Sequence, residues 1–206
     1  MYQRDARLME TPLDLFCLRS GTFCPQCEAK IRSGKVSQLD VDVTRLLLDL
    51  EPQFPALQDA TYIKAAGTED FLAVVLKEGD LSRIPVNVLT KLARGLSAAI
   101  GKKVKFLEDS SDPTKFLESL VAPARIIAVN QVWLPDGSVA TRIILDDKRS
   151  LRMSENSIIE LGSKIKNMSL RIDFERKKFF APSGGRGREA GVRSFSRRSI
   201  DRRRRG

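Results

Sequence analysis

Residues 61–77, TYIKAAGTEDFLAVVLK, contain two runs that are rich in strand-forming side chains. The first run covers residues 61–66 and the second covers residues 71–77. Residues 67–70, Gly-Thr-Glu-Asp, have the composition of a turn. This stretch therefore predicts two adjacent strands joined by a short connection, and the segments on either side of it predict the remaining elements of the same unit.

The segment before the strands predicts a helix over residues 37–50. Ser37 followed by Asp40 fits a capping box. The apolar side chains recur at helical spacing, at Leu39, Val43, Leu46, Leu47 and Leu50. Pro52 and Pro55 end the helix.

The segment after the strands predicts two more helices and a strand. Residues 80–84 form one short helical turn, and residues 87–101 form a longer helix that ends at Gly101. Residues 102–108, KKVKFLE, follow as a strand. The predicted order for this unit is α-β-β-α-α-β.

A second unit repeats this order with a shorter connection before its last helix. Asp112 and Pro113 begin a helix at 112–121. Two strands, RIIAVNQVWL and VATRIILDD, are joined by Pro135-Asp-Gly137, which is strong turn chemistry. Residues 154–166 then predict a helix, and residues 168–175 predict a closing strand.

We therefore expect an α+β protein built from two tandem units of α-β-β-α-α-β type. The expected boundaries are an N-terminal extension over 1–35, a first unit over 36–110, a second unit over 111–178 and a tail over 179–206. A chain of 206 residues has room for two such units.

All three cysteines lie in the N-terminal extension, spaced Cys-x6-Cys-x2-Cys at Cys17, Cys24 and Cys27. This spacing is typical of three ligands of a zinc site, and the chain has no histidine to act as the fourth. Two alternatives remain open. The cysteines are small buried residues without a metal, or Cys24 and Cys27 form a redox pair.

The net charge of +10 lies entirely at the C-terminal end. Residues 176–206 contain 12 Lys/Arg and two Asp/Glu, which leaves 24 of each in residues 1–175. The tail is rich in Gly, Ser and Arg and has few apolar side chains, so we expect it to be disordered alone. Arginine binds phosphate bidentately and stacks on bases, which favours RNA as the partner over a solubilising role or a membrane-surface patch.

Three segments give the chain a resemblance to a known family, the archaeal NusA-like proteins with a tandem pair of KH domains. The segments are TPLDLFCLRSGTFCPQCEAKIRSGKVSQLDVDV (11–43), EGDLSRIPVNVLTKLARGLSAAIGKKVKFLE (78–108) and APARIIAVNQVWLPDGS (122–138). The resemblance extends from about Thr11 to Glu175 and does not include the tail after about Pro182. It implies two KH type II-like domains behind a small zinc knuckle.

The same resemblance implies a fourth metal ligand. The knuckle of this family has four cysteines spaced Cys-x2-Cys-x6-Cys-x2-Cys, and Asp14 stands where the first of them would be. An aspartate carboxylate is an acceptable ligand of Zn²⁺. The implied site is Asp14, Cys17, Cys24 and Cys27, with a structural Zn²⁺ because four filled positions leave no place for a reactive water.

The chain departs from the family at the loop that grips nucleic acid. A KH domain binds the backbone through a Gly-x-x-Gly loop between two helices, where glycine lets phosphate approach the main chain. In the first unit, the degenerate loop is Pro85, Val86, Asn87 and Val88. The second unit has DKRSLRMSEN (147–156) in this region and no Gly-x-x-Gly motif either.

The function that follows is a non-enzymatic RNA-binding protein that contacts RNA mainly through its tail. The tail arginines expected to bind are Arg186, Arg188, Arg193, Arg197, Arg198, Arg202, Arg203, Arg204 and Arg205. Basic positions on the body are a second source of affinity or a solvated surface balanced by acids, namely Lys102, Lys103, Lys105, Lys148, Arg149 and Arg152. Trp133, the sole tryptophan, is either an exposed anchor or a half-buried strand residue.

The expected partner is ribosomal RNA or a nascent transcript, on the ribosome or on RNA polymerase, with a role in transcription elongation or termination or as a ribosome-associated factor. The alternative is an adaptor whose KH-like pair binds protein only. Without histidine, a phosphate-binding loop or a nucleophile motif, no enzymatic activity and no small-molecule substrate are expected. No apolar run of about 18 residues or secretory signal is present, so we expect a cytoplasmic protein without a membrane partner.

Overall fold

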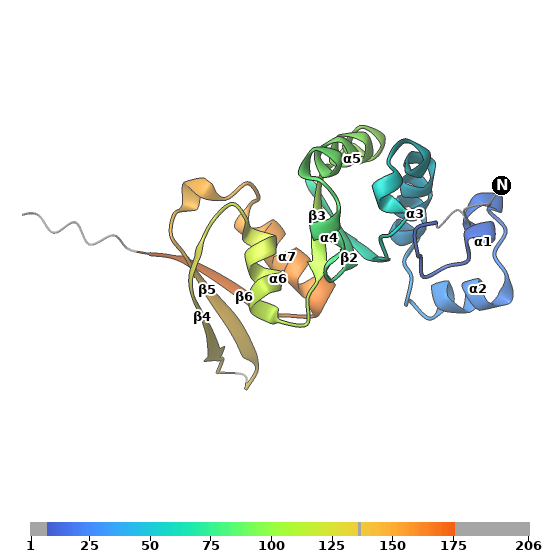
Figure 1. Cartoon of the computed structure of the whole chain (residues 1–206). Helices are drawn as coiled ribbons and strands as arrows, with labels where there is room; N and C mark the ends of the chain where they lie inside the picture. The colour runs from blue at the N-terminus through green and yellow to red at the C-terminus, as the bar shows by residue number, and fades with distance from the viewer. Residues whose placement is uncertain (1–7, 136, 176–206) are drawn as a thin grey trace, which may run out of the picture. The chain divides into compact units, whose positions relative to one another are not determined.

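The computed structural model describes residues 8–135 and 137–175 (Figure 1). It is a mixed α+β protein, and this coarse class is as the sequence predicts. The described residues belong to one compact unit that extends to Glu175. Two short helices, α1 (Leu15–Ser20) and α2 (Pro25–Arg32), come before the first of two sheets.

The first sheet has the order β1-β2-β3 and is formed by Tyr62–Gly67, Phe71–Lys77 and Lys103–Asp109. β1 pairs antiparallel with β2, and β2 pairs parallel with β3. A parallel pair needs a crossover connection, which α4 (Asp80–Arg83) and α5 (Val86–Ile100) supply here. With α3 (Gln38–Leu50) ahead of β1, the order is α-β-β-α-α-β, as the sequence predicts.

Local signals in the sequence set the ends of these helices. Ser37 caps α3, and the reciprocal hydrogen bonds of a capping box with Asp40 are both present. Gly101 ends α5 in the left-handed conformation at φ 76, which glycine adopts without strain. Two 3₁₀ turns, η1 (Glu51–Gln53) and η2 (Pro55–Leu57), follow α3 where the prolines end it.

The second sheet has the order β4-β5-β6 and is formed by Ile126–Trp133, Val139–Leu145 and Leu170–Phe174. β4 and β5 are antiparallel, and β5 and β6 are parallel, so the strand pattern repeats that of the first sheet. α6 (Pro113–Val121) precedes β4, and α7 (Glu155–Lys166) leads into β6.

One element of the second unit differs from the expected order. In place of the first of the two helices, the described chain has a single 3₁₀ turn, η3 (Lys148–Ser150). Only about nine residues separate β5 from α7, and this is too short for a helix and its two connections. The second unit is therefore α-β-β-α-β with a 3₁₀ turn before its last helix.

The strand β2 is buried on both of its faces. Leu72, Val74 and Leu76 pack in one core with α3 and α5. Ala73 and Val75 pack in a second core with residues of α6, α7 and the second sheet. A strand buried on both faces reads as a continuous apolar run, which explains why FLAVVLK does not alternate.

Candidate functional site

Two short helices bring the three cysteines together. Cys17 lies on α1, which Gly21 ends at φ 77. Cys24 is the N-cap residue of α2, Pro25 follows at its first position, and Cys27 lies one turn into the helix. Proline suits the first helical position because its missing N–H has no partner there.

The three cysteine Sγ atoms lie within 4.8 Å of one another, and all three thiols are free. Tetrahedral Zn²⁺ with bonds to sulfur of about 2.3 Å separates its sulfurs by roughly 3.8 Å. Cys17 and Cys27 are buried and Cys24 is half-buried, so the group is protected from solvent. The three sulfurs could therefore hold a metal ion, and thiolates favour a soft or borderline one.

Main-chain hydrogen bonds support two of the sulfurs. The N–H of Cys24 donates to Cys17 Sγ at 3.3 Å, and the N–H of Asp14 donates to Cys27 Sγ at 3.4 Å. Such bonds favour sulfur in its charged, metal-binding form.

The thiols also shift one another's pKa values. The pKa of Cys24 is lowered by hydrogen bonds from the backbone N–H and the thiol of Cys27. The backbone N–H of Cys24 acts to lower the pKa of Cys17, but burial and the neighbouring thiols outweigh it and the pKa is raised. Cys24 is thus the first of these two thiols to lose its proton.

Asp14 lies beside this group through its main chain, and its carboxylate caps α1. Asp14 Oδ1 accepts hydrogen bonds from the N–H of Phe16 at 2.8 Å and of Cys17 at 3.3 Å. The set of described candidate ligand atoms within 4.8 Å consists of the three sulfurs and includes no carboxylate oxygen. The sequence signal of Asp14 has a second explanation, because aspartate is a favoured N-cap residue.

The cysteine segment is packed into the first core. Cys17, Leu18 and Cys27 belong to the same buried cluster as α3 and the first sheet. Arg45 on α3 donates from Nε to the carbonyl of Leu18 at 2.9 Å, and its guanidinium lies 5.7 Å from the centre of the Phe23 ring. A metal bound here would hold together a segment on which part of this core depends.

The degenerate loop of the first unit is short and lacks a left-handed residue. Ile84 ends α4, and Pro85 is the N-cap residue of α5. Val86 is 79% exposed at the first position of α5, and Asn87 Oδ1 accepts a hydrogen bond from the N–H of Val88. An exposed valine and a proline without an N–H occupy the place where a phosphate would meet glycine.

The basic positions of the body do not form one surface. Lys148 pairs with Glu155 at 2.7 Å, and Lys102 Nζ donates to the carbonyl of Thr68 at 2.5 Å. Lys103, Lys105 and Arg152 instead line one cavity of about 440 Å³ together with Phe71. This cavity was not predictable from the sequence, since Lys103 and Arg152 lie in different units.

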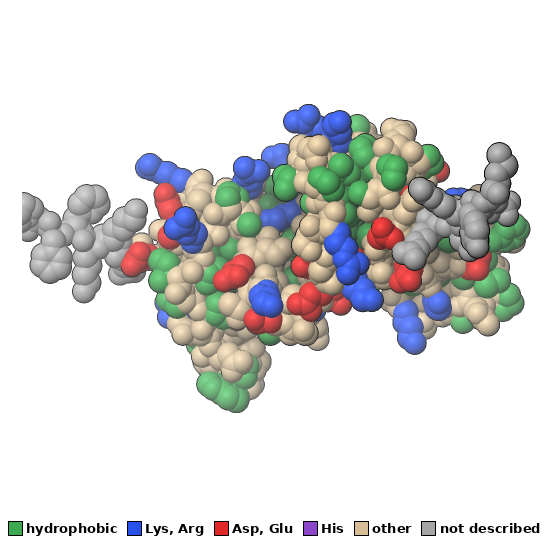
Figure 2. All heavy atoms as spheres, viewed as in Figure 1, with side chains coloured by type: hydrophobic (Ala, Val, Ile, Leu, Met, Phe, Trp, Pro, Cys, Tyr) green, Lys and Arg blue, Asp and Glu red, His purple; other side chains and the backbone are tan. Residues whose placement is uncertain are grey.

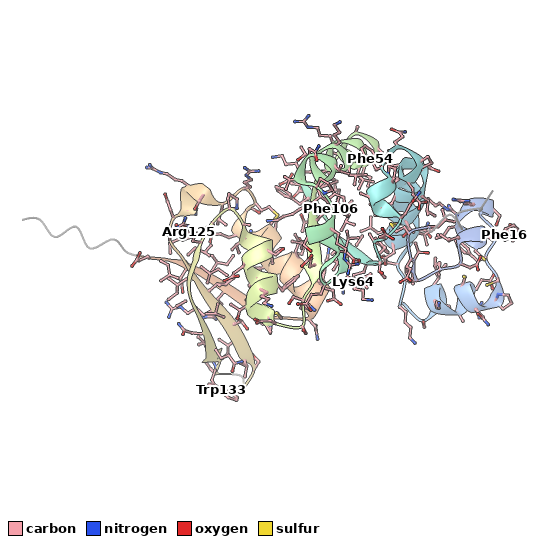
Figure 3. All side chains as sticks on the ribbon, viewed as in Figure 1. Phe16, Phe54, Lys64, Phe106, Arg125 and Trp133 are labelled. Carbon is pink, nitrogen blue, oxygen red and sulfur yellow. The ribbon has the colours of Figure 1, made fainter. Side chains whose placement is uncertain are left out.

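Two large apolar side chains stand out on the surface. Trp133 at the end of β4 is 75% exposed, and Phe16 on α1 is 77% exposed (Figure 3). Val139, which pairs with Trp133 across the hairpin, is also exposed. Of the two interpretations of Trp133 given by the sequence, the exposed one is confirmed.

The tail arginines lie outside the described residues. None of the helices in the described part of the chain combines the length and the apolar character needed to cross a lipid bilayer.

The comparisons with known proteins are sparse. No protein-family model matches the chain, and the search of curated proteins also found no match. Among solved structures, the chain is similar to one described as "Crystal structure of APE1850", at 16% sequence identity and a TM-score of 0.42. That similarity covers 64% of this chain and 96% of the other, and at this level it carries no functional argument.

Proposed function

We propose that the chain is a non-enzymatic, NusA-like RNA-binding protein with a zinc knuckle, two degenerate KH type II-like units and an Arg-rich tail that makes most of the contact with RNA. The observation that carries this proposal is the position of the charge. Residues 176–206 contain 12 Lys/Arg against two Asp/Glu, and they follow a body that is electrically balanced. Affinity from such a segment is electrostatic, since each phosphate contact releases counterions.

The repeated fold supports the KH part of this proposal. Both sheets combine an antiparallel pair with a parallel pair in the same strand order. In the first unit, two helices connect the parallel pair, which is where a KH domain places its gripping loop. The loop chemistry at Pro85 and Val86 is the reason to assign the main RNA contact to the tail.

The cysteine geometry supports the zinc part. Three sulfurs in contact range, with main-chain N–H donors to two of them, fit a structural Zn²⁺ site. Asp14 would supply the fourth ligand through the carboxylate oxygen that does not cap α1. The metal would stabilise the segment before α3 and would take no part in a reaction.

The experiment is RNA binding by the full chain with the nine tail arginines changed to glutamine, measured by fluorescence anisotropy over a range of salt concentrations. We expect the affinity to fall by about 100-fold and the slope of log Kd against log salt to flatten. A matched variant with the same nine positions changed to lysine keeps the charge and should keep most of the slope. If the glutamine variant binds as tightly as the wild type, the tail is not the main contact.

Crosslinking in the native cell separates the two settings. Crosslinks concentrated at a few positions of ribosomal RNA would indicate a ribosome-associated factor. Crosslinks spread along nascent transcripts, together with co-purifying RNA polymerase, would indicate a role in transcription elongation or termination.

A second candidate function is that of a protein adaptor on a ribosomal or RNA polymerase complex, whose KH-like pair does not bind RNA. The exposed pair of Trp133 and Val139 at the tip of the β4–β5 hairpin favours it, since exposed tryptophan is a frequent anchor in protein interfaces. Trp133→Ala should then release a co-purifying protein while RNA binding by the tail is unchanged.

A further inference from the structure

A cavity on the body gathers positive charge without acidic neighbours. Its volume is about 440 Å³, and its lining includes Lys103 and Lys105 on β3 and Arg152 before α7, with no Asp or Glu. Figure 2 shows Lys and Arg side chains over α5 and in the hollow beside it, while most Asp and Glu side chains on this face lie lower in the view. A recess lined by one sign of charge attracts ions of the other sign.

Strand geometry aims two of the cations in the same direction. Lys103 and Lys105 are two residues apart on β3, so their side chains leave the same face of the sheet. Lys103 Nζ lies 5.4 Å from the centre of the ring of Phe71, its partner in the parallel ladder. Phe71 is 9% exposed, so its ring positions the lysine and is not free to stack on a base.

Lys105 is held in place by the end of a helix. Its Nζ donates to the carbonyl of Leu120 at 2.8 Å and to the carbonyl of Ala122 at 2.9 Å. An ammonium group has three N–H donors, so one of them remains for another acceptor. Burial and the charge of Arg152 lower the pKa of Lys105 to about 8, which agrees with positive charge that nothing offsets.

The other two cations have no competing partner. Within residues 8–135 and 137–175, neither Lys103 nor Arg152 takes part in an ion pair. Both are exposed on the rim of the cavity. An incoming anion would therefore meet two free cations at the rim and one N–H of Lys105 further in.

We propose that this cavity binds a phosphate group of the RNA backbone, which gives the body of the protein a contact of its own in place of the missing Gly-x-x-Gly grip. The inference rests on the RNA-binding function proposed above. Since the ring of Phe71 is covered and the lining offers only cations, the contact positions RNA and does not read its sequence.

The test is a comparison of two double variants of the full chain with equal changes of charge. Lys103→Gln/Arg152→Gln removes the two rim cations, which have no partners to lose in the fold. Lys35→Gln/Lys115→Gln removes two exposed cations elsewhere on the body. Lys105 is left intact because its change would disturb the end of α6.

We expect the cavity variant to bind unrelated RNA sequences about tenfold more weakly than the control variant, with the salt slope reduced by about 1 to 2. Equal affinity and slope for the two variants would overturn the inference. A loss confined to one RNA sequence would also overturn it, because it would indicate base readout.

The same pair is measured in the chain whose nine tail arginines are changed to glutamine, so that the two proposals fail separately. A cavity effect that persists there, with weak residual binding, supports both. A tail effect with no cavity effect leaves the proposed function standing and overturns the cavity. Binding to vesicles of anionic lipid, but not to RNA, would overturn both and assign the phosphate to a headgroup.

Discussion

Asp40 on α3 accepts a hydrogen bond from the hydroxyl of Tyr62 on β1, at 2.7 Å between Oδ1 and Oη. The same oxygen accepts the N–H of Ala65 at 2.5 Å, while Oδ2 accepts the N–H and the hydroxyl of Ser37 at 2.7 Å each. One carboxylate thus caps a helix and joins it to a strand. Asp40 is only 5% exposed, and these four donors are what make its burial possible.

Tyr62→Phe should lower the free energy of unfolding by about 2 kcal/mol, because it removes a buried hydrogen bond to a charged group. Urea denaturation followed by circular dichroism measures the change. Asp42→Asn, which alters an exposed carboxylate on the same helix, is the control and should change stability little. A Tyr62→Phe protein as stable as the wild type would mean that this bond contributes nothing net.

The same bond predicts a loss of stability in alkali. Burial, followed by the negative charge of Asp40, raises the pKa of Tyr62 above its ordinary value of 10.0. The folded state therefore keeps its proton where the unfolded state loses it, and stability should fall as the pH rises above about 10. Urea midpoints measured across this range should show the fall, and Tyr62→Phe should remove it.

Lys105 predicts the opposite slope at lower pH. Its pKa is about 8 in the folded protein, mainly because of burial, against an ordinary value of 10.5. The unfolded chain binds more protons between these values, so stability should rise with pH from about 8 to 10. Lys105→Met should flatten this part of the profile. A wild-type profile that is already flat there would indicate that the two carbonyl partners hold Lys105 in its charged form.

Gly162 predicts the cost of an added methyl group at a close helix–strand contact. A Cβ at this position on α7 would lie 2.3 Å from Leu170 Cδ1 on β6, whereas a Cβ at Gly95 on α5 would lie 3.5 Å from Leu50 Cδ1. Gly162→Ala should destabilise the protein by about 1–3 kcal/mol through overpacking. Gly95→Ala is the matched control and should be neutral or stabilising by up to about 1 kcal/mol. Thermal unfolding of the two variants should separate them, and similar melting temperatures would contradict the close contact.

Asp14→Asn separates the two roles of Asp14. Asparagine is as good an N-cap residue as aspartate but is a poorer zinc ligand, so the cap should survive while the affinity for Zn²⁺ falls by about tenfold or more. Competition with a chromophoric chelator measures the affinity, and Cys24→Ser provides the reference for the loss of a certain ligand. Unchanged affinity in Asp14→Asn would leave the site with three protein ligands.

The sequence was sufficient for the elements that local chemistry determines. The capping box at Ser37 and Asp40, the left-handed end at Gly101 and the order of strands and helices are confirmed. The close spacing of Cys17, Cys24 and Cys27 also follows from their separation along the chain.

The remaining features depend on contacts between distant segments. The second use of Asp40 requires Tyr62 to lie opposite α3, and the cavity requires Arg152 to meet β3. No local pattern contains that information. The 3₁₀ turn in place of a helix was visible only as a short connection, because the repeat itself suggested that the order would be kept.

The double burial of β2 makes the two repeats dependent on each other. Ala73 and Val75 are covered by side chains that belong to the second repeat, including Leu117 and Leu161. A strand in the interior of one repeat is therefore part of the interior of the next, and neither can be cut away at residue 110 without leaving apolar surface bare. What began in the sequence as two copies of a module behaves thermodynamically as a single object, in which a substitution in α6 or α7 is also a change to the core of the first repeat.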